Sequence, residues 1–465
     1  MPSHIYDAVV IGAGVAGLTA GDTLAQAGID VLVLEAKDYP GGRINTIHYG
    51  DLYAESGAMV ITGDEKETLG LLSDLSLDSL FTLGPHGVEL FFGKRMIRLT
   101  RIDGNIESVA DLISLLQMML AGLHRGDKRI PFLGPGLFLA YRRALRKIQD
   151  ECRHITFPYN PDARPNWDTS TFAEFLDGFD PRLRPLFDLQ LKVTAGELSD
   201  RISLFWGLIT FHWNVHGGFY WLGGGTSILP QVLAARLGHR LLLQSRALSV
   251  SDGSVPRVGF IANGSKQEVE AKAVILATPP RNAIEIIEGL APWKLEALRS
   301  VRFGAYVPVH LRCQRRFWEA KIRTGYLNCS GVVFADLVDA TRGQPGEEGI
   351  LICFIAGQEA RRLLEASDEH IFAEVVRDIE KVFPGSTAEV IEYRVFRWPD
   401  GIPYFPPNIG SKLEQIRSPQ GNLFFCGDYT QGAGINDAVI SGQLAAREVQ
   451  EFLRAGRKLS NQPID

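Results

Sequence analysis

The chain opens with an apolar run that is followed by a glycine-rich turn and an amphipathic segment. The run at residues 8–11 predicts a buried strand, and the periodicity of residues 15–27 predicts a helix. A second apolar run at residues 31–34 predicts another strand, and it ends at an acid, Glu35. A strand, a helix and a second strand in this order indicate a parallel βαβ unit.

The turn of this unit carries glycines at the spacing of a dinucleotide-binding motif. Gly12 permits the tight turn, Gly14 lets the backbone approach a pyrophosphate, and Gly17 lets the helix pack closely on the strand. The first helical residues, Val15 and Ala16, would offer free N–H groups and a partial positive charge to that pyrophosphate.

Glu35 follows the motif at the distance expected of an acid that binds the hydroxyl pair of a ribose. An acid at this position would repel a 2′-phosphate, which argues against a 2′-phosphorylated dinucleotide. The alternative is an ordinary βαβ turn that ends in a surface acid. The two apolar strands around the motif favour the dinucleotide.

The alternation of strands and helices is lost over the next part of the chain. Residues 107–123 and 137–148 predict amphipathic helices within a largely helical stretch, 105–215. The second of these helices gathers four basic residues near its end, namely Arg142, Arg143, Arg146 and Lys147. This face either touches a membrane surface or is a solvated cationic face over a buried stripe, and the second interpretation is favoured.

Strands return in the second half of the chain. Strands are predicted at residues 240–250, 273–277, 306–312, 349–356 and 423–428, and helices at residues 228–237, 368–383 and 435–453. Ser170 or Thr171 could cap a helix that starts near Phe172. The aromatic runs at residues 205–213 and 219–222 predict either core or pocket walls.

Length and composition narrow the class of protein. With 465 residues the chain is too long for one compact core, so we expect two or more domains. The net charge of −6 gives no indication of nucleic-acid binding. Five scattered cysteines predict free thiols in a reducing compartment, and neither a signal peptide nor a membrane-spanning run is found. We therefore expect a cytoplasmic protein without a metal site.

Two further elements complete a pattern that is known from one family. A loop with Lys37, Gly42 and Arg43 follows the acid, and a small-residue element around Gly57 comes next. Glycine motif, Leu-Glu-Ala, Gly-Gly-Arg and acid-x-Gly-Ala in this order resemble the flavin amine oxidase superfamily. That superfamily includes monoamine and polyamine oxidases, L-amino acid oxidases, protoporphyrinogen oxidases and carotenoid desaturases. Many of its members carry arginine where this chain has Lys37.

The resemblance implies an α/β fold and an FAD-dependent oxidase or dehydrogenase. A Rossmann-like FAD-binding domain of the glutathione-reductase type would carry an inserted α+β substrate domain of mixed sheet and helices. The FAD-binding domain would comprise residues 1–90, 218–290 and 395–465. The substrate domain would comprise residues 91–217 and 291–394.

The resemblance also implies which residues hold FAD. Arg43 would bind phosphate oxygens, the strand at Leu248 would lay its backbone along the adenine, and Asp428 would bind the ribityl chain. The helix that starts at Ile435 would direct its N-terminus at the pyrimidine side of the flavin. The complete expected set is Gly12, Gly14, Val15, Ala16, Gly17, Glu35, Ala36, Lys37, Gly42, Arg43, Gly57, Ala58, Met59, Leu248, Thr278, Trp398, Gly427, Asp428, Gly434, Ile435 and Asn436.

Two positions depart from the pattern of amine oxidases. Amine oxidases of the family usually carry a lysine near flavin N5, and the corresponding residue here is Pro308. One ring of their aromatic cage is replaced by Gly434. Both departures weaken the case for an amine substrate, which would gain from cation–π contact.

The segment of residues 398–405 and the turn of residues 432–437 instead resemble protoporphyrinogen oxidases, and the first also resembles desaturases. We expect Trp398, Tyr404 and Tyr306 to be catalytic. The Trp398 segment has no cysteine for a covalent flavin bond, so we expect non-covalent FAD.

Three functions remain open. The first is oxidation of a bulky, largely apolar small molecule at a C–C or C–N bond, with hydride transfer to flavin N5 and O₂ or another acceptor. The second is an amine or L-amino acid oxidase that releases hydrogen peroxide. The third is a non-redox flavin-dependent isomerase or cyclase. The protein is expected to be a monomer or homodimer without nucleic-acid partners, and peripheral membrane contact remains open.

Overall fold

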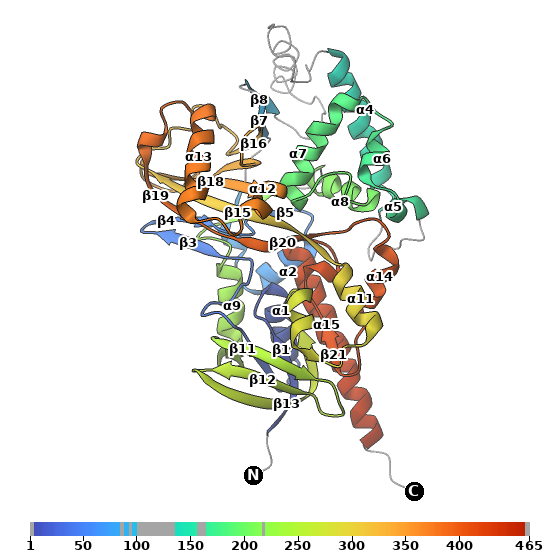
Figure 1. The fold of residues 1–465 in the computed structure, drawn as a ribbon. Coiled ribbons are helices and arrows are strands. Elements are labelled where there is room, and N and C mark those ends of the chain that lie inside the picture. Colours follow the sequence, from blue (N-terminus) through green and yellow to red (C-terminus); the bar gives the residue numbers. More distant parts are fainter. Residues whose placement is uncertain are drawn as a thin grey trace.

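The computed structural model describes residues 4–83, 88–92, 95–99, 135–155, 164–215 and 219–460. The chain folds into two bodies, each built on one large sheet, with a group of helices beside the second sheet (Figure 1). The helix expected at residues 107–123 lies outside the described residues. Among the described residues, no helix is long and apolar enough to cross a membrane.

The first sheet contains the predicted βαβ unit. Its strands are β1 (Ile5–Ile11), β2 (Val31–Leu34), β10 (Leu241–Leu242), β11 (Ser245–Ser251), β12 (Arg257–Ala262), β13 (Ser265–Leu276), β14 (Ile287–Glu288) and β21 (Leu423–Phe425). Their order is β10-β2-β1-β13-β12-β11-β14, and β21 also pairs with β13. The strands β2, β1, β13 and β21 are joined by parallel pairings, so their carboxyl ends meet at one edge.

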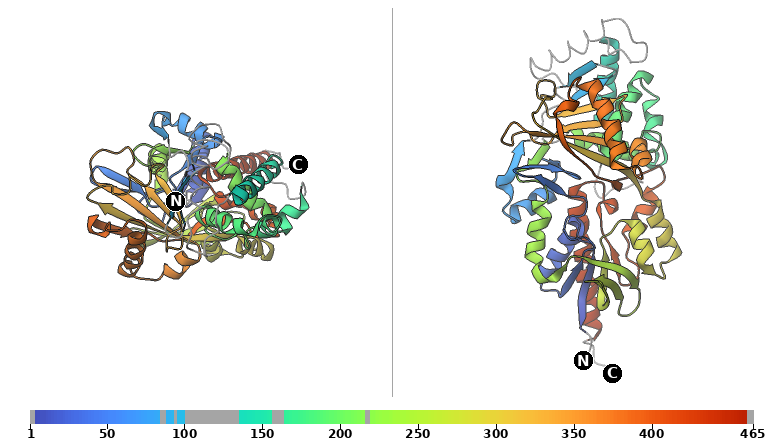
Figure 2. Two further views of the ribbon diagram at one scale, coloured as in Figure 1. Left: turned by 90° about the horizontal axis from the view of Figure 1, so that it is seen from above. Right: turned by 60° about the vertical axis from the view of Figure 1, so that its left-hand side comes forward.

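Two helices pack together against the first sheet because small residues let them approach. They are α1 (Val15–Gln26) and α15 (Ile435–Ser460). A Cβ atom on Gly442 of α15 would collide with the carbonyl oxygen of Ala16 on α1. The strand β1 begins and the helix α15 ends at the same end of the molecule (Figures 1 and 2). The last helix of the chain therefore supports the first motif.

The second sheet forms the other body. Its strands are β7 (Val88–Phe92), β8 (Arg95–Leu99), β15 (Arg302–Cys313), β16 (Tyr326–Ser330), β17 (Asp336–Asp339), β18 (Gly349–Ala356), β19 (Val390–Val395) and β20 (Trp398–Tyr404). Their order is β19-β15-β18-β17-β16-β7-β8, and β20 also pairs with β15. β20 thus joins this sheet, although residues 395–465 are expected to belong to the FAD-binding domain. The domain boundaries stay a prediction.

The two faces of the second sheet meet different neighbours. On the outer face, Val307 and Cys353 pack with Val375 of α13 (Asp368–Val382). On the inner face, Ile352 packs with Tyr49 of the small β3–β4 sheet, whose strands are β3 (Thr46–Tyr49) and β4 (Leu52–Glu55). Side chains alternate between faces along a strand, so Tyr306, Pro308 and His310 also lie on the inner face.

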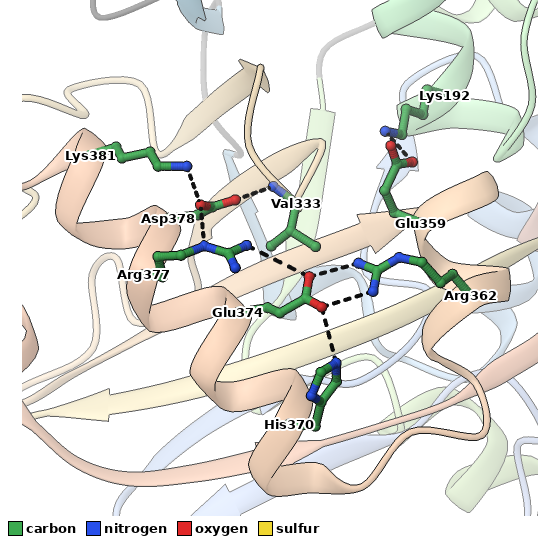
Figure 3. Close-up of polar contacts among 9 residues, drawn as sticks. All are labelled: Lys192, Val333, Glu359, Arg362, His370, Glu374, Arg377, Asp378 and Lys381. Atoms are coloured by element: carbon green, nitrogen blue, oxygen red, sulfur yellow. Dashed lines mark hydrogen bonds and ion pairs between the residues drawn. The ribbon is translucent and has the colours of Figure 1, made fainter.

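Ion pairs fix α13 on the outer face (Figure 3). The buried Asp378 accepts a hydrogen bond from the backbone N–H of Val333 at 2.6 Å and contacts Lys381 at 2.5 Å. Glu374 binds Arg362 of α12 (Gln358–Leu363) through two hydrogen bonds of 2.8 and 2.6 Å. A further ion pair, between Lys192 and Glu359, joins α12 to α7 (Arg184–Ala195) (Figure 3).

The remaining elements cover the two sheets. A second small sheet contains β5 (Ile61–Thr62), β6 (Phe81–Leu83) and β9 (Phe219–Leu222). The other helices are α2 (Lys66–Asp74), α4 (Pro135–Cys152), α5 (Pro165–Thr169), α6 (Phe172–Leu176), α8 (Leu204–Val215), α9 (Ile228–Leu237), α10 (Pro280–Ile286), α11 (Pro292–Ser300) and α14 (Gly410–Arg417). Thr171 caps α6 in a capping box with Glu174, which confirms one of the two expected caps.

His310 connects the inner face of the second sheet to the β3–β4 sheet. Its Nε2 lies 3.0 Å from the carbonyl oxygen of Glu55, and its Nδ1 lies 2.8 Å from the hydroxyl of Tyr49. A carbonyl can only accept, so Nε2 donates and Nδ1 accepts from Tyr49. Both ring nitrogens of the neutral His310 side chain thus form a hydrogen bond. Burial lowers the pKa of His310 to about 4.

We expect His310 to make the protein less stable in acid. Between pH 6.5 and about 4 the unfolded chain protonates this histidine and the folded chain does not. The free energy of unfolding should therefore fall by about 3 kcal/mol as the pH decreases through this window. Urea denaturation across this pH range should show a shallower decrease for His310→Gln than for the exposed control His370→Gln. Equal slopes in the two variants would contradict the assignment.

Candidate active site

Four predicted segments meet at the carboxyl edge of the first sheet. Gly12 follows β1, Glu35 follows β2, Thr278 follows β13 and Gly427 follows β21. The parallel register of these neighbouring strands brings the four chain ends to the same edge. Open parallel sheets bind their ligands at this edge.

The glycines of the opening turn stand in different surroundings. Gly12 has φ +105°, and a Cβ there would lie 2.7 Å from the carbonyl oxygen of Ala277. A Cβ on Gly17 would collide with the carbonyl oxygen of Gly12, so helix α1 needs glycine to pack on β1. A Cβ on Gly14 would meet no atom within 4 Å. Gly14 therefore borders open space at the N-terminus of α1, beside Val15 and Ala16.

Glu35 is buried and holds the neighbouring loops together. Its carboxylate accepts hydrogen bonds from the backbone N–H of Ala13 at 2.7 Å and of Lys37 at 2.9 Å. The carbonyl oxygens of Glu35 and Lys37 accept in turn from the backbone at the start of β11. Ala36 lies between these contacts. Leu248 is exposed at a bulge further along β11.

Arg43 joins three segments that are far apart in the sequence. Its guanidinium donates to the carbonyl oxygen of Gly401 at 2.8 Å and forms an ion pair with Asp428 at 2.6 Å. Gly42 has φ +62°, and a Cβ there would lie 3.3 Å from the Cα of Gly14. The loop after β2 is therefore fixed between the opening turn, β20 and the strand end of β21.

The small-residue element lies against the same loop. A Cβ on Gly57 would collide with the carbonyl oxygen of Arg43. The indole N–H of Trp398 donates to the carbonyl oxygen of Ser56 at 2.6 Å. The Nζ atom of Lys37 lies 5.1 Å from the centroid of the Trp398 ring. Trp398 thus connects β20 to the expected cofactor-binding loops.

The C-terminal segment adds a turn in front of α15. Gly427 has φ +150°, and Ile435 is buried in the core of the first body. Near Gly434, the carboxylate of Asp437 accepts from the backbone N–H of Ala433 at 2.9 Å. The side-chain oxygen of Asn436 accepts from the backbone N–H of Thr68 at 2.9 Å.

Asp437 was not predicted from the sequence. Burial raises the pKa of Asp437 to about 7, and the nearby charge of Asp428 acts in the same direction. The available signal was an acid in the first turn of a helix that follows a Gly-Ala-Gly turn, where such an acid can cap the backbone.

The three expected catalytic residues do not form one group. Tyr306 and Trp398 are paired across β15 and β20, and the hydroxyl of Tyr306 donates to the carbonyl oxygen of Val193 at 3.1 Å. Tyr404 pairs with Arg302 further along the ladder and lies in the core beside the helices. The structure therefore brings together Tyr306 and Trp398 and places Tyr404 apart from them.

We expect Asp428→Ala to weaken FAD retention. The substitution removes a hydrogen-bonding carboxylate and leaves Arg43 without its 2.6 Å partner. The loss should be about 1–3 kcal/mol, or about 5- to 150-fold in the dissociation constant. Titration of the apoprotein with FAD, followed by flavin fluorescence, measures it. Asp180→Ala, which breaks a surface pair with Arg182, should leave the constant unchanged. Equal constants for the two variants would remove Asp428 from the site.

Comparison with known proteins agrees with this arrangement. The family model described as flavin containing amine oxidoreductase matches residues 15–450. Amine oxidase [flavin-containing] B of Cavia porcellus is 25% identical, over 95% of this chain and 86% of that protein. Amine oxidase [flavin-containing] A of Canis lupus familiaris is 23% identical, over 97% of this chain and 86% of that protein.

Solved structures share the fold. Cyclohexylamine oxidase from Brevibacterium oxydans IH-35A superposes with a TM-score of 0.76 at 21% identity, covering 97% of this chain and 100% of that one. Wild-type putrescine oxidase bound to putrescine gives a TM-score of 0.75 at 20% identity, with 97% and 100% covered. The predicted α/β fold is confirmed.

Proposed function

Because this chain belongs to the flavin-containing amine oxidoreductase family and is therefore an FAD-dependent oxidoreductase, we propose that it oxidises a bulky, largely apolar small molecule. A hydride would leave a carbon atom by cleavage of its C–H bond, and the adjoining C–C or C–N bond would become a double bond as the neighbouring atom loses a proton. Oxygen or another acceptor would complete the cycle. The observation that carries the proposal is an apolar cluster that adjoins the expected cofactor loops at Trp398.

The residues at the sheet edge fit FAD. Gly14 borders open space where a pyrophosphate needs room, and the hydroxyl of Thr278 is buried without a hydrogen-bond partner among the described residues. Glu35 would bind the ribose, and Arg43 would supply planar donors for phosphate oxygens. Bound FAD would supply the hydride acceptor, and the protein would bind and orient the substrate.

The apolar cluster supplies a surface for an apolar substrate. Its buried members are Leu189, Tyr306, Ala335 and Ala356, and Leu186, Val193, Trp398 and Ile402 pack against them. The hydroxyl of Tyr306 is engaged by a backbone carbonyl, so the ring presents carbon atoms to its surroundings. Such a surface would bind an apolar body and exclude water.

Two glycines leave room for the Tyr306 ring. A Cβ on Gly401 would lie 2.6 Å from the Tyr306 ring, and one on Gly196 would lie 3.0 Å from it. The ring therefore fills the space in which side chains at these two positions would stand. Two residues further along β15, Pro308 offers no donor or base near the cluster.

Amine oxidation is the second candidate function. It is favoured by the relatives, because the curated proteins and the solved structures reported above carry the names of amine oxidases. Such an enzyme would release hydrogen peroxide when it uses oxygen.

An anaerobic screen distinguishes the candidate functions. The yellow protein is mixed with cyclohexylamine, putrescine, a porphyrinogen or a polyene, and the flavin absorbance is followed. Bleaching by the porphyrinogen or polyene, without bleaching by the amines, is expected. Bleaching by the amines alone, with hydrogen peroxide released in air, would replace the proposal with amine oxidation. Product formation without bleaching would indicate a non-redox isomerase or cyclase.

A further inference from the structure

A buried acid lies on the inner face of the second sheet, which is the face that carries Tyr306. Asp336 of β17 is paired across the ladder with Phe354 of β18, and Phe354 is paired with Pro308 of β15. Residues paired directly across a sheet share a face. Asp336, Phe354 and Pro308 therefore form one row on the inner face. Asp336 is only 4% exposed.

Asp336 has a neutral partner and lacks a charged one. The side-chain amide of Asn328 on the adjacent strand β16 donates to its carboxyl oxygen at 3.1 Å. No ion pair to Asp336 occurs within the part of the chain that the structure describes. Burial raises the pKa of Asp336 well above its usual range. A carboxyl in such surroundings favours its neutral form, and a cation placed beside it would favour the carboxylate. Within the described ranges Asp336 therefore offers a carboxyl with no competing cation to a ligand that brings a positive charge.

The surroundings of Asp336 remain partly accessible. Phe354 lies on a strand with neighbours on both sides, yet its side chain is partly exposed. Tyr326 and Met59 are also partly exposed, and the Tyr326 hydroxyl donates to the Met59 sulfur at 3.3 Å. The Trp221 ring lies 6.1 Å from the Tyr326 ring. Met59 belongs to the element expected to approach the flavin, so this accessible surface adjoins the cofactor side.

We propose that Asp336, oriented by Asn328, is the specificity-determining residue of the substrate site and pairs with a cationic amino group on an otherwise apolar substrate. This inference rests on the proposed function and adds one polar group to its apolar substrate. The amino group that Asp336 binds need not be the group that is oxidised. A bound cation favours the carboxylate form, so the pair would form with release of a proton.

Two non-oxidisable probes test the pairing. In 1-methylcyclohexylamine and 1-methylcyclohexanol the carbon that bears the polar group carries no hydrogen, so hydride cannot leave it. Each probe is titrated into the yellow holoprotein, and the perturbation of the flavin absorption spectrum gives a dissociation constant. We expect the cationic amine to bind about tenfold or more tightly than the neutral alcohol. In Asp336→Asn this preference should disappear, while the alcohol should bind as before.

A matched control lies on the same strand. Asp339 of β17 is equally buried, but it points to the outer face and binds Thr341. Asp339→Asn should keep the preference for the amine. A wild-type protein without the preference, or an Asp336→Asn variant that retains it, would overturn the proposal. If Asp336→Asn does not fold, the Asn328→Ala variant is tested instead. It should reduce the preference for the amine, and an unchanged preference would also overturn the proposal.

The role of Asp336 and the proposed function are tested by different measurements. The probe titration measures binding without turnover, whereas the anaerobic screen measures reduction of the flavin. Suppose that the protein prefers the amine probe but that no apolar compound bleaches the flavin. This result would contradict the proposed function alone. Bleaching by an apolar compound with equal binding of the two probes would remove only the role of Asp336.

Discussion

A Gly14→Val variant is expected to fold like the wild type and to purify without FAD. Gly14 has φ −68° and ψ 172°, an extended conformation that valine adopts readily. A Cβ at this position would meet no atom of the protein within 4 Å. The added side chain would therefore be harmless to the fold and would occupy the space that the pyrophosphate needs. The ratio of flavin to protein absorbance measures the loss, which should be complete.

The control for this variant is Gly70→Val. Gly70 is an exposed residue of α2, and a Cβ there would also meet nothing within 4 Å. The control should retain full flavin, and the apoproteins of both variants should unfold at similar temperatures. A Gly14→Val protein with the normal flavin content would mean that FAD binds elsewhere.

The second large effect is expected at Lys294, a lysine that is fully buried in the first body. Its ammonium group donates to the carbonyl oxygens of Gln415 at 2.9 Å, Ile416 at 2.8 Å and Ser418 at 2.6 Å. It also lies 3.7 Å from the centroid of the Phe425 ring. These carbonyls terminate helix α14, so Lys294 of α11 caps that helix. Lys294→Met should lower the free energy of unfolding by about 3–5 kcal/mol.

Urea denaturation of the apoprotein measures the effect of Lys294→Met. Lys412→Met is the matched control, because Lys412 joins the same two helices through an exposed ion pair with Glu296 at 2.8 Å. Exposed pairs contribute little, so the control should lose less than about 1 kcal/mol. Similar losses in the two variants would mean that the buried contacts of Lys294 add nothing to stability.

Elements that depend on local pattern were predictable from the sequence. The helix predicted at residues 15–27 is α1 (Val15–Gln26), and the helix predicted at residues 368–383 is α13 (Asp368–Val382). Both follow from an apolar stripe with clear ends. The strand predicted at residues 240–250 is wrong in one respect. It is divided into β10 and β11, because Gln244 adopts φ +51°.

Contacts between distant segments were not predictable in the same way. The family resemblance implies that Arg43 and Asp428 hold one cofactor, but nothing in either segment indicates that they pair directly. Asp336 gave no signal at all, because a single acid in an apolar stretch reveals neither its burial nor the face to which it points. The aromatic run at residues 205–213 predicts either core or pocket walls, and its sequence does not decide between them. Phe205, Trp206 and Phe211 of α8 are buried in the core.

The bridge from Arg43 to Gly401 and Asp428 has a consequence for biosynthesis. The ribosome makes the glycine turn first, but strand β21 and helix α15, which complete that edge and support it, are made last. If these segments hold the flavin as we expect, its capture waits until strand β21 and helix α15 have been translated. A nascent chain stalled before residue 428 would lack the Asp428 partner of Arg43 and would be expected not to retain FAD.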